Sequence, residues 1–483
     1  MLVILRAKDL GGKQITSPIN QRAQSVDSNV LALLISSVVA LLFARMIVHA
    51  STWTRKRELL SNFFENDTKF MLAVVAYLPL ILLIGMLTSS NLMNVKIISI
   101  SGFIFGACFW LISYNFTSGG RAIFSQLNGF SAMPTGLADW WTIPDLVDCK
   151  IPTDCDRLGR PPIYGHGWKL LLPLANDKIS LMLGAIMAGF VCYSLGKLAH
   201  NFGVPIVAVM FYLSPSLIFS IERGQSDLFV IGLILIFLSY QRNSKALNAI
   251  VAMFLVTLKP FFVVAFLKNR PSFKRIFALT PIFLICYFIS ISFNLSNVKF
   301  ARLATIYPPE YQIGIDQIPS LIVQMLDPRY QIDPTIWRGV DSYKLSMTVG
   351  IVLFVVISVF TIRRYSTRIN VLKLEQLTKF QENNLMVFSA LYLIVYLSGS
   401  QVAYKSWVAT PIIIFTLSRF IDLDQPAEPS KIIFLTLVMF GGFAIDIWIL
   451  RSIGGFLLGV YCALILSYFY RESHFFSKLG KFS

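Results

Sequence analysis

Long apolar runs separated by polar segments follow one another from residue 29 to residue 470. An α-helix needs about 20 predominantly apolar residues to cross the hydrocarbon core of a bilayer. The pattern therefore predicts an all-α, polytopic bundle of about 11–13 transmembrane helices, with no soluble domain of ordinary size. We expect spans near 29–49, 71–89, 96–115, 180–198, 204–221, 228–240, 276–294, 346–362, 384–398, 402–418, 432–450 and 453–469.

One further apolar stretch, residues 246–267, has basic residues on both sides. These are Arg242 and Lys245 before it, and Lys268 and Arg270 after it. Basic flanks mark cytoplasmic loops, so the stretch is expected to enter and leave on the same side. Two half-helices with Lys259-Pro260 at the apex satisfy this, because proline breaks a helix. A lysine and irregular backbone at membrane depth need a partner or water, which predicts a polar cavity near Lys259.

The basic loops also assign sides to the other segments. Basic clusters at 268–275, 363–379 and 471–481 are expected to be cytoplasmic, which places residues 117–179, 222–227 and 295–345 on the outer face. Arg55, Lys56 and Arg57 conflict with this alternation, so the N-terminal topology stays open. The expected organisation is 1–116 with the first three spans, 117–179 as the first outer loop, 180–294 as a helical unit with the break at 259–260, 295–345 as the second outer loop, and 346–483 with the C-terminal spans and a cytoplasmic tail.

Composition supports a membrane location. Only 14% of the residues are charged and 55% are hydrophobic, whereas soluble domains carry about a quarter charged residues. The net charge of +17 is explained by contact with anionic lipid headgroups rather than with nucleic acid. We expect a multi-pass protein of the cell (inner) membrane.

The first outer loop combines carboxylates with aromatic residues, a pairing suited to sugars. Sugar faces stack on rings, and carboxylates accept hydroxyl hydrogen bonds or a proton. Asp139 stands between Leu137-Ala138 and Trp140-Trp141, where desolvation would raise its pKa toward that of a general base. The same loop offers Asp145, Tyr164 and His166 as substrate-binding candidates. The alternative is a solvated loop with an interfacial aromatic belt.

Two further segments carry polar residues at the predicted membrane boundary. In the first, Gly224 permits a tight turn that holds the binding candidates Glu222, Arg223, Gln225 and Asp227. Glu222 and Arg223 could equally be a local ion pair at a helix end. The second is Lys259, which could bind an anion such as phosphate or could extend to the interface. The second outer loop could cap such a site or be inert.

Metal and nucleotide motifs are weak or absent in the sequence. Cys149 and Cys155 are candidates for a disulfide if their loop faces an oxidising compartment. No third Cys or nearby His completes a metal site, and although an acidic loop can hold a divalent cation, no ligand spacing for one is recognisable. There is no Walker loop, dinucleotide fingerprint, HExxH or nucleophile elbow, and no cofactor is assigned.

The segments GQSDLFVIGLILIFL and LNAIVAMFLVTLKPFFVVAFL resemble the GT-C glycosyltransferases. The likeness is to the family 87 type of polyprenyl-phosphate-dependent mannosyltransferases, which have a Gly-Gln turn before a span and a Lys-Pro in the following short helix. Here these are Gly224-Gln225 and Lys259-Pro260, and PPIYGHGWKLLLPL resembles the end of the family's first outer loop. The family's Asp-Phe-x-x-Tyr-like motif has its nearest counterpart at Asp139-Trp140-Trp141. That motif follows three apparent spans here, which suggests an N-terminal extension.

The resemblance implies a GT-C fold and transfer of mannose or a similar sugar from polyprenyl phosphate to a glycan or lipid acceptor, with inversion. Asp139, or another aspartate of the first outer loop, would be the base, and Lys259, with Arg223, would stabilise the leaving phosphate. Two alternatives remain open: a transporter or flippase of lipid-linked saccharides, and a polysaccharide polymerase or ligase.

Overall fold

The computed structural model describes residues 95–115, 140, 166–212, 214–222, 224–240, 244–291, 312–319, 322, 340–365, 374–398, 401–420, 429–443 and 448–470. Within these ranges the chain is almost entirely helical, and the two short strands, β1 and β2, are two residues each. The spans expected at 29–49 and 71–89 lie outside the described residues, as do Arg55, Lys56 and Arg57.

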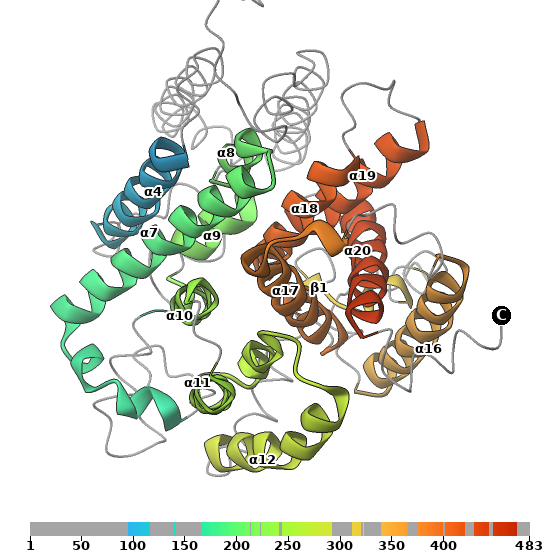
Figure 1. The fold of residues 1–483 in the computed structure, drawn as a ribbon, viewed down its shortest axis with the longest axis horizontal. Coiled ribbons are helices and arrows are strands. Elements are labelled where there is room, and N and C mark those ends of the chain that lie inside the picture. The colour runs from blue at the N-terminus through green and yellow to red at the C-terminus, as the bar shows by residue number, and fades with distance from the viewer. Residues whose placement is uncertain are drawn as a thin grey trace, which may run out of the picture.

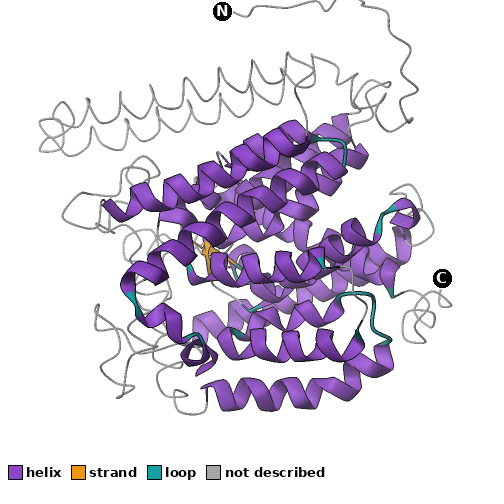
Figure 2. Ribbon diagram, turned by 60° about the vertical axis from the view of Figure 1, so that its left-hand side comes forward, coloured by secondary structure: helices purple, strands orange, loops and turns teal. Residues whose placement is uncertain are grey.

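The helices lie side by side in a bundle (Figures 1 and 2). The first half contains α4 (Val95–Asn115), the 3₁₀ helices η1 (His166–Leu170) and η2 (Leu172–Ala175), α7 (Asp177–Asn201), α8 (Pro205–Tyr212), α9 (Pro215–Glu222), α10 (Ser226–Ser239), α11 (Lys245–Leu258), η3 (Pro260–Leu267) and α12 (Phe273–Ile291). The second half contains β1 (Gln312–Ile313), α16 (Val340–Tyr365), η8 (Leu374–Gln376), α17 (Lys379–Leu397), β2 (Gln401–Val402), η9 (Ala403–Ala409), α18 (Thr410–Phe420), α19 (Pro429–Phe443) and α20 (Trp448–Phe469).

Three of the described helices are long and apolar enough to cross a membrane: α7, the Leu345–Tyr365 part of α16, and Leu450–Phe469 of α20. Of these, the apolar window of α16 is the least covered by protein, with only 22% of its residues buried. Such a face suits contact with lipid, and the length and composition of these helices suit a multi-pass membrane protein.

The span expected at 204–221 is wrong in one respect, because it consists of two short helices, α8 and α9. Pro215 has no backbone N–H and begins α9, where a missing donor costs nothing. Ser214 precedes it, and its Oγ accepts a hydrogen bond from the backbone N–H of Leu217 at 3.3 Å. Ser214 and Pro215 therefore start a new helix within an otherwise continuous apolar run.

The span expected at 402–418 is also shorter as an α-helix. Its first part is β2 and the 3₁₀ helix η9, and α18 begins only at Thr410. Pro411 in the first turn of α18 fits a helix start there.

The second outer loop, expected to be residues 295–345, reaches into the bundle in its described part. β1 pairs antiparallel with β2, with Gln312 opposite Val402. After β1, Ile315 and Asp316 are fully buried, and the Ile315 N–H donates to the carbonyl of Tyr396 in α17 at 3.0 Å. The loop also ends earlier than expected, since α16 starts at Val340.

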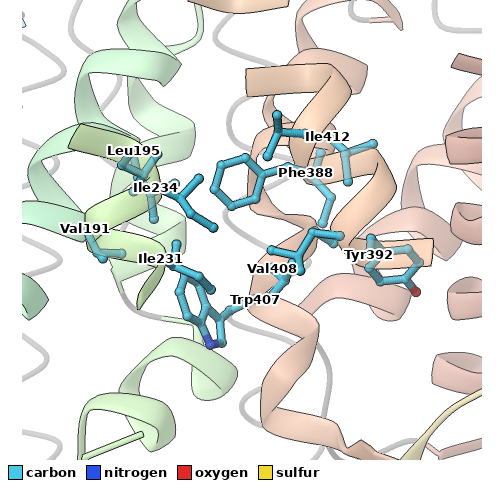
Figure 3. Packing of buried hydrophobic residues seen from close by; sticks show 14 of the residues in the cluster. Val191, Leu195, Ile231, Ile234, Phe388, Tyr392, Trp407, Val408 and Ile412 are labelled. Carbon is cyan, nitrogen blue, oxygen red and sulfur yellow. The ribbon is translucent and has the colours of Figure 1, made fainter. Parts of the chain in front are cut away.

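The core joins the α7–α10 side of the bundle to the α17–α18 side. Figure 3 shows Ile231 and Ile234 of α10 facing Phe388 of α17 and Trp407 of η9. Phe388 is 1% exposed and Ile234 is 0% exposed. This apolar contact holds α10 beside α17. It therefore also positions the side chains that α10 carries.

Glycines allow α4 and α7 to approach closely. A Cβ at Gly106 would lie 2.5 Å from the carbonyl oxygen of Ala188, and one at Gly184 would lie 2.2 Å from the Trp110 ring. Small residues at helix crossings let backbones approach in this way.

Gly106→Val should therefore lower stability, since the contacted atom is backbone and cannot rotate away. Overpacking of this kind costs about 1–3 kcal/mol. The thermal midpoint of the detergent-purified protein measures the effect. Ile104→Val, at an exposed position of the same helix, is the control, and an equal midpoint for both variants would contradict the close packing.

Candidate functional site

The turn between α9 and α10 explains the Gly-Gln pair. Gly224 has a positive φ of 62°. Its N–H donates to the Ile221 carbonyl at 2.9 Å, and the Gln225 N–H donates to the Ser220 carbonyl at 3.0 Å. These two bonds form a Schellman motif, in which a glycine ends the helix in the left-handed conformation. The motif turns the chain so that α10 starts directly at Ser226.

Asp227 lies in the first turn of α10 and is only 7% exposed. A carboxylate near a helix N-terminus is favoured by the helix dipole. Its Oδ1 also accepts a hydrogen bond from Lys259 Nζ, which makes an ion pair. The side chains are 15% and 10% exposed for Lys259 and Asp227, respectively, so this pair is largely shielded from water.

Lys259 is the point where α11 breaks. The helix ends at Leu258, Lys259 is extended with φ −153° and ψ 134°, and Pro260 starts η3. Residues 246–267 are therefore not one straight rod, and the break stands at the Lys-Pro pair that the sequence indicates. Proline removes the N–H that would continue the helix.

The chain after Lys259 returns along α10. Lys259 is at the start of α10, whereas Lys268, after η3, is at its end, because Lys268 Nζ donates to the carbonyls of Phe237 at 2.7 Å and Tyr240 at 2.6 Å. These are carbonyls at the C-terminus of α10, which a cation stabilises.

The two basic flanks of residues 246–267 lie at the same end of the segment formed by α11 and η3. Arg275, near the start of α12, donates from Nη2 to the backbone carbonyl of Lys245, the first residue of α11, at 3.3 Å. We call residues 245–268 the re-entrant hairpin. Its ascending arm is α11, its apex is Lys259 and its descending arm is η3.

A narrow cleft, with room for about one water molecule (about 10 Å³), lies beside the apex. It lies between α10 and η3 on one side and α17 and η9 on the other. Apart from Asp227, its lining is apolar or aromatic, being formed by Ile231, Phe261, Phe262, Leu391, Val395, Trp407 and Val408. The polar cavity expected near Lys259 stays a prediction, because most of the first outer loop lies outside the described residues. Among the described residues, the Asp227–Lys259 ion pair lies at the edge of this apolar cleft.

Two tryptophans of the first outer loop, Trp140 and Trp168, are core residues. Trp140 and Trp168 are both 0% exposed. Their rings contact Phe229 of α10, with centroids at 5.6 and 5.7 Å. They cannot stack a sugar in this arrangement, and neither belongs to an interfacial belt. These two rings instead pack on α10 near Asp227.

The structure brings together three of the residues selected from the sequence. Asp227 and Lys259 are paired, and Gln225, 4% exposed, is the N-cap of α10. Glu222 ends α9 and His166 starts η1, but their side chains are not among those described. Outside the described residues are Asp139, Asp145, Tyr164, Arg223, Cys149 and Cys155. In the described part of the chain, no group of three His, Cys, Asp or Glu residues is arranged to hold a metal.

Sequence reasoning missed the base of the re-entrant hairpin. Asn269 and Arg270 have positive φ values of 63° and 48°, a strained conformation for residues other than glycine. Two residues near the start of α17 hold them there. Asn383 Oδ1 accepts from the Asn269 N–H at 2.9 Å, and Glu382 Oε1 pairs with Arg270 Nε at 2.5 Å. The polar run Gln381–Asn384 at the head of an apolar helix was the available signal.

No protein-family model, no curated protein and no solved structure matches this chain. The resemblance to family 87 enzymes therefore rests on the short motifs alone.

A double-mutant cycle on Asp227→Asn and Lys259→Met should show coupling of about 1–3 kcal/mol. Each single variant leaves one shielded charge without its main partner, and the double variant removes both charges. The free energy of unfolding in detergent is the quantity to measure.

The matched control is the cycle on Lys379 and Glu382, a pair with a nitrogen–oxygen distance of 3.1 Å in which the lysine side chain is 76% exposed. Its coupling should be below about 1 kcal/mol. Additive effects of Asp227→Asn and Lys259→Met would show that the pair does not form.

Proposed function

We propose that this chain is a membrane glycosyltransferase of GT-C type that uses a polyprenyl-phosphate-linked sugar, mannose or a similar hexose, as donor. The acceptor is a glycan or a glycolipid on the outer face of the membrane. The observation that carries the proposal is the re-entrant hairpin with Lys259 at its apex, paired with Asp227 beside an apolar cleft. The Gly224-Gln225 and Lys259-Pro260 motifs agree with it.

The hairpin suits a lipid-linked phosphate because it offers a cation and apolar walls together. An ammonium group has three N–H donors, so a phosphate oxygen and a carboxylate can share it. Asp227 holds Lys259 in place before the donor arrives, which removes the cost of ordering a long side chain at that moment.

The proposed reaction is a single displacement with inversion. A carboxylate of the first outer loop, Asp139, takes the proton from the acceptor hydroxyl. The acceptor oxygen attacks the anomeric carbon, and the bond from that carbon to the phosphate oxygen breaks. The electron pair leaves with polyprenyl phosphate, whose negative charge Lys259 and Arg223 stabilise.

The position of Trp140 supports a base in this loop. Asp139 is the preceding residue in the sequence, and the Trp140 ring packs on Phe229, two residues after Asp227. Through Trp140, this part of the loop contacts the same turn of α10 that carries Asp227 of the ion pair. Both the base and the cation then belong to segments attached to α10.

The assay uses the purified chain in proteoliposomes, a radiolabelled polyprenyl-phosphate mannose and a panel of glycan and glycolipid acceptors. Wild type should form a glycosidic product. Asp139→Asn and Lys259→Ala should each lower kcat at least about 100-fold, because each removes transition-state stabilisation. Size-exclusion elution and the thermal midpoint establish that each variant is folded.

Lys245→Ala is the matched control, since Lys245 is an exposed lysine at the other end of α11, and its activity should equal wild type. Movement of labelled lipid across the bilayer without any product would support a flippase instead. An active Asp139→Asn variant would assign the base to another carboxylate.

A further inference from the structure

The break in α11 leaves a carbonyl that the first outer loop satisfies. In a continuous helix, the Leu258 carbonyl would accept from the N–H of Phe262. Here the Phe262 N–H donates to the Lys259 carbonyl at 3.2 Å instead. The Leu258 carbonyl accepts a hydrogen bond from the indole Nε1–H of Trp168 at 3.2 Å. Trp168 thus bonds the backbone directly before Lys259.

Gly167 lets this segment reach the helix end. A Cβ at Gly167 would lie 2.1 Å from Thr257 Oγ1 and 2.7 Å from the Thr257 carbonyl carbon. No other residue fits there without a shift of η1 or of α11, because part of the contact is backbone. Gly167 and Trp168 together fix η1 against the last turn of α11.

The same tryptophan contacts the helix that carries the other half of the ion pair. Its ring centroid lies 5.7 Å from that of Phe229 in α10. Trp168 therefore contacts both elements. It donates to the carbonyl of Leu258, the residue before Lys259, and its ring packs on Phe229, two residues after Asp227. Trp168 is fully buried, so its side chain has little freedom to leave this position.

We propose that Trp168 is a positioning residue that holds Lys259 in register with Asp227 and so fixes the cation for the donor phosphate. This rests on the proposed function for its catalytic consequence, but the positioning itself does not. Lys259 is a single extended residue between α11 and η3, so the direction of its side chain depends on where these two helices end and begin. A small displacement of a charged group in a site costs much of its effect on rate.

The direct test measures how accessible the Lys259 amine is, independently of activity. The purified protein is treated briefly with acetic anhydride, and mass spectrometry gives the rate of Lys259 acetylation relative to exposed Lys245. Trp168→Phe keeps a ring but removes the N–H. It should raise the relative rate about threefold or more, because the ion pair opens more often.

Trp110→Phe is the matched control. Trp110 is 1% exposed and its ring contacts Trp140, with centroids at 5.2 Å. Among the described residues, its Nε1 has no hydrogen-bond partner. The same substitution in the same aromatic cluster should therefore leave Lys259 acetylation unchanged. Equal rates in the Trp168→Phe and Trp110→Phe proteins would overturn the proposal and assign Trp168 to core packing alone.

Gly167→Ala provides a second route, because it displaces η1 without altering any hydrogen-bonding side chain. It should also accelerate Lys259 acetylation, and an unchanged rate would contradict the role of η1. In the transfer assay, Trp168→Phe should lower kcat about tenfold with a smaller change in KM. Faster acetylation in a protein that transfers no sugar would support the positioning and reject the transferase.

Discussion

A helix that breaks inside an apolar bundle must find partners for the backbone groups and charges that the break exposes. This constraint organises the region around Lys259. Asp227 receives the ammonium group, and Trp168 donates to the Leu258 carbonyl. Both partners come from elements distant in sequence, so the break depends on the arrangement of the whole first half of the bundle.

The base of the re-entrant hairpin obeys the same constraint. Lys268 binds the last carbonyls of α10, and Arg270 pairs with Glu382 of α17. Two successive non-glycine residues in the left-handed region each cost of order 1 kcal/mol or more, so the bonds from α17 must offset this strain. The hairpin is thereby fixed at both ends, with its apex against α10 and its base against α17.

Much of the helical pattern could be predicted from the sequence. The apolar runs predict α4, α7, α10, α12, α16, α17, α19 and α20 within several residues, because burial and helix periodicity act locally. The same-side flanks and Lys259-Pro260 located the break, since basic residues and proline have strong positional preferences. The split between α8 and α9 was missed although Ser214-Pro215 carried the signal.

The partners at the break could not be predicted, because they depend on tertiary contacts. Asp227 was selected as a polar residue at a boundary, but nothing local pairs it with a lysine 32 residues away. The sequence predicts sugar stacking or an interfacial position for the aromatic residues of the first outer loop, because aromatic residues in a polar loop fit both; Trp140 and Trp168 are buried instead. Their burial against Phe229 follows from the bundle's shape. The strained Asn269-Arg270 turn likewise requires α17 to be in place.

The central claim is that residues 245–268 enter and leave the membrane on one side. Ala246→Cys and Ser272→Cys, each at an exposed position of a cysteine-free variant, can be labelled with a membrane-impermeant maleimide in sealed vesicles of known orientation. The account predicts that both thiols react from the same side and are protected from the other. Labelling of the two positions from opposite sides would mean that this stretch crosses the membrane, and the hairpin that brings Lys259 to Asp227 would be wrong.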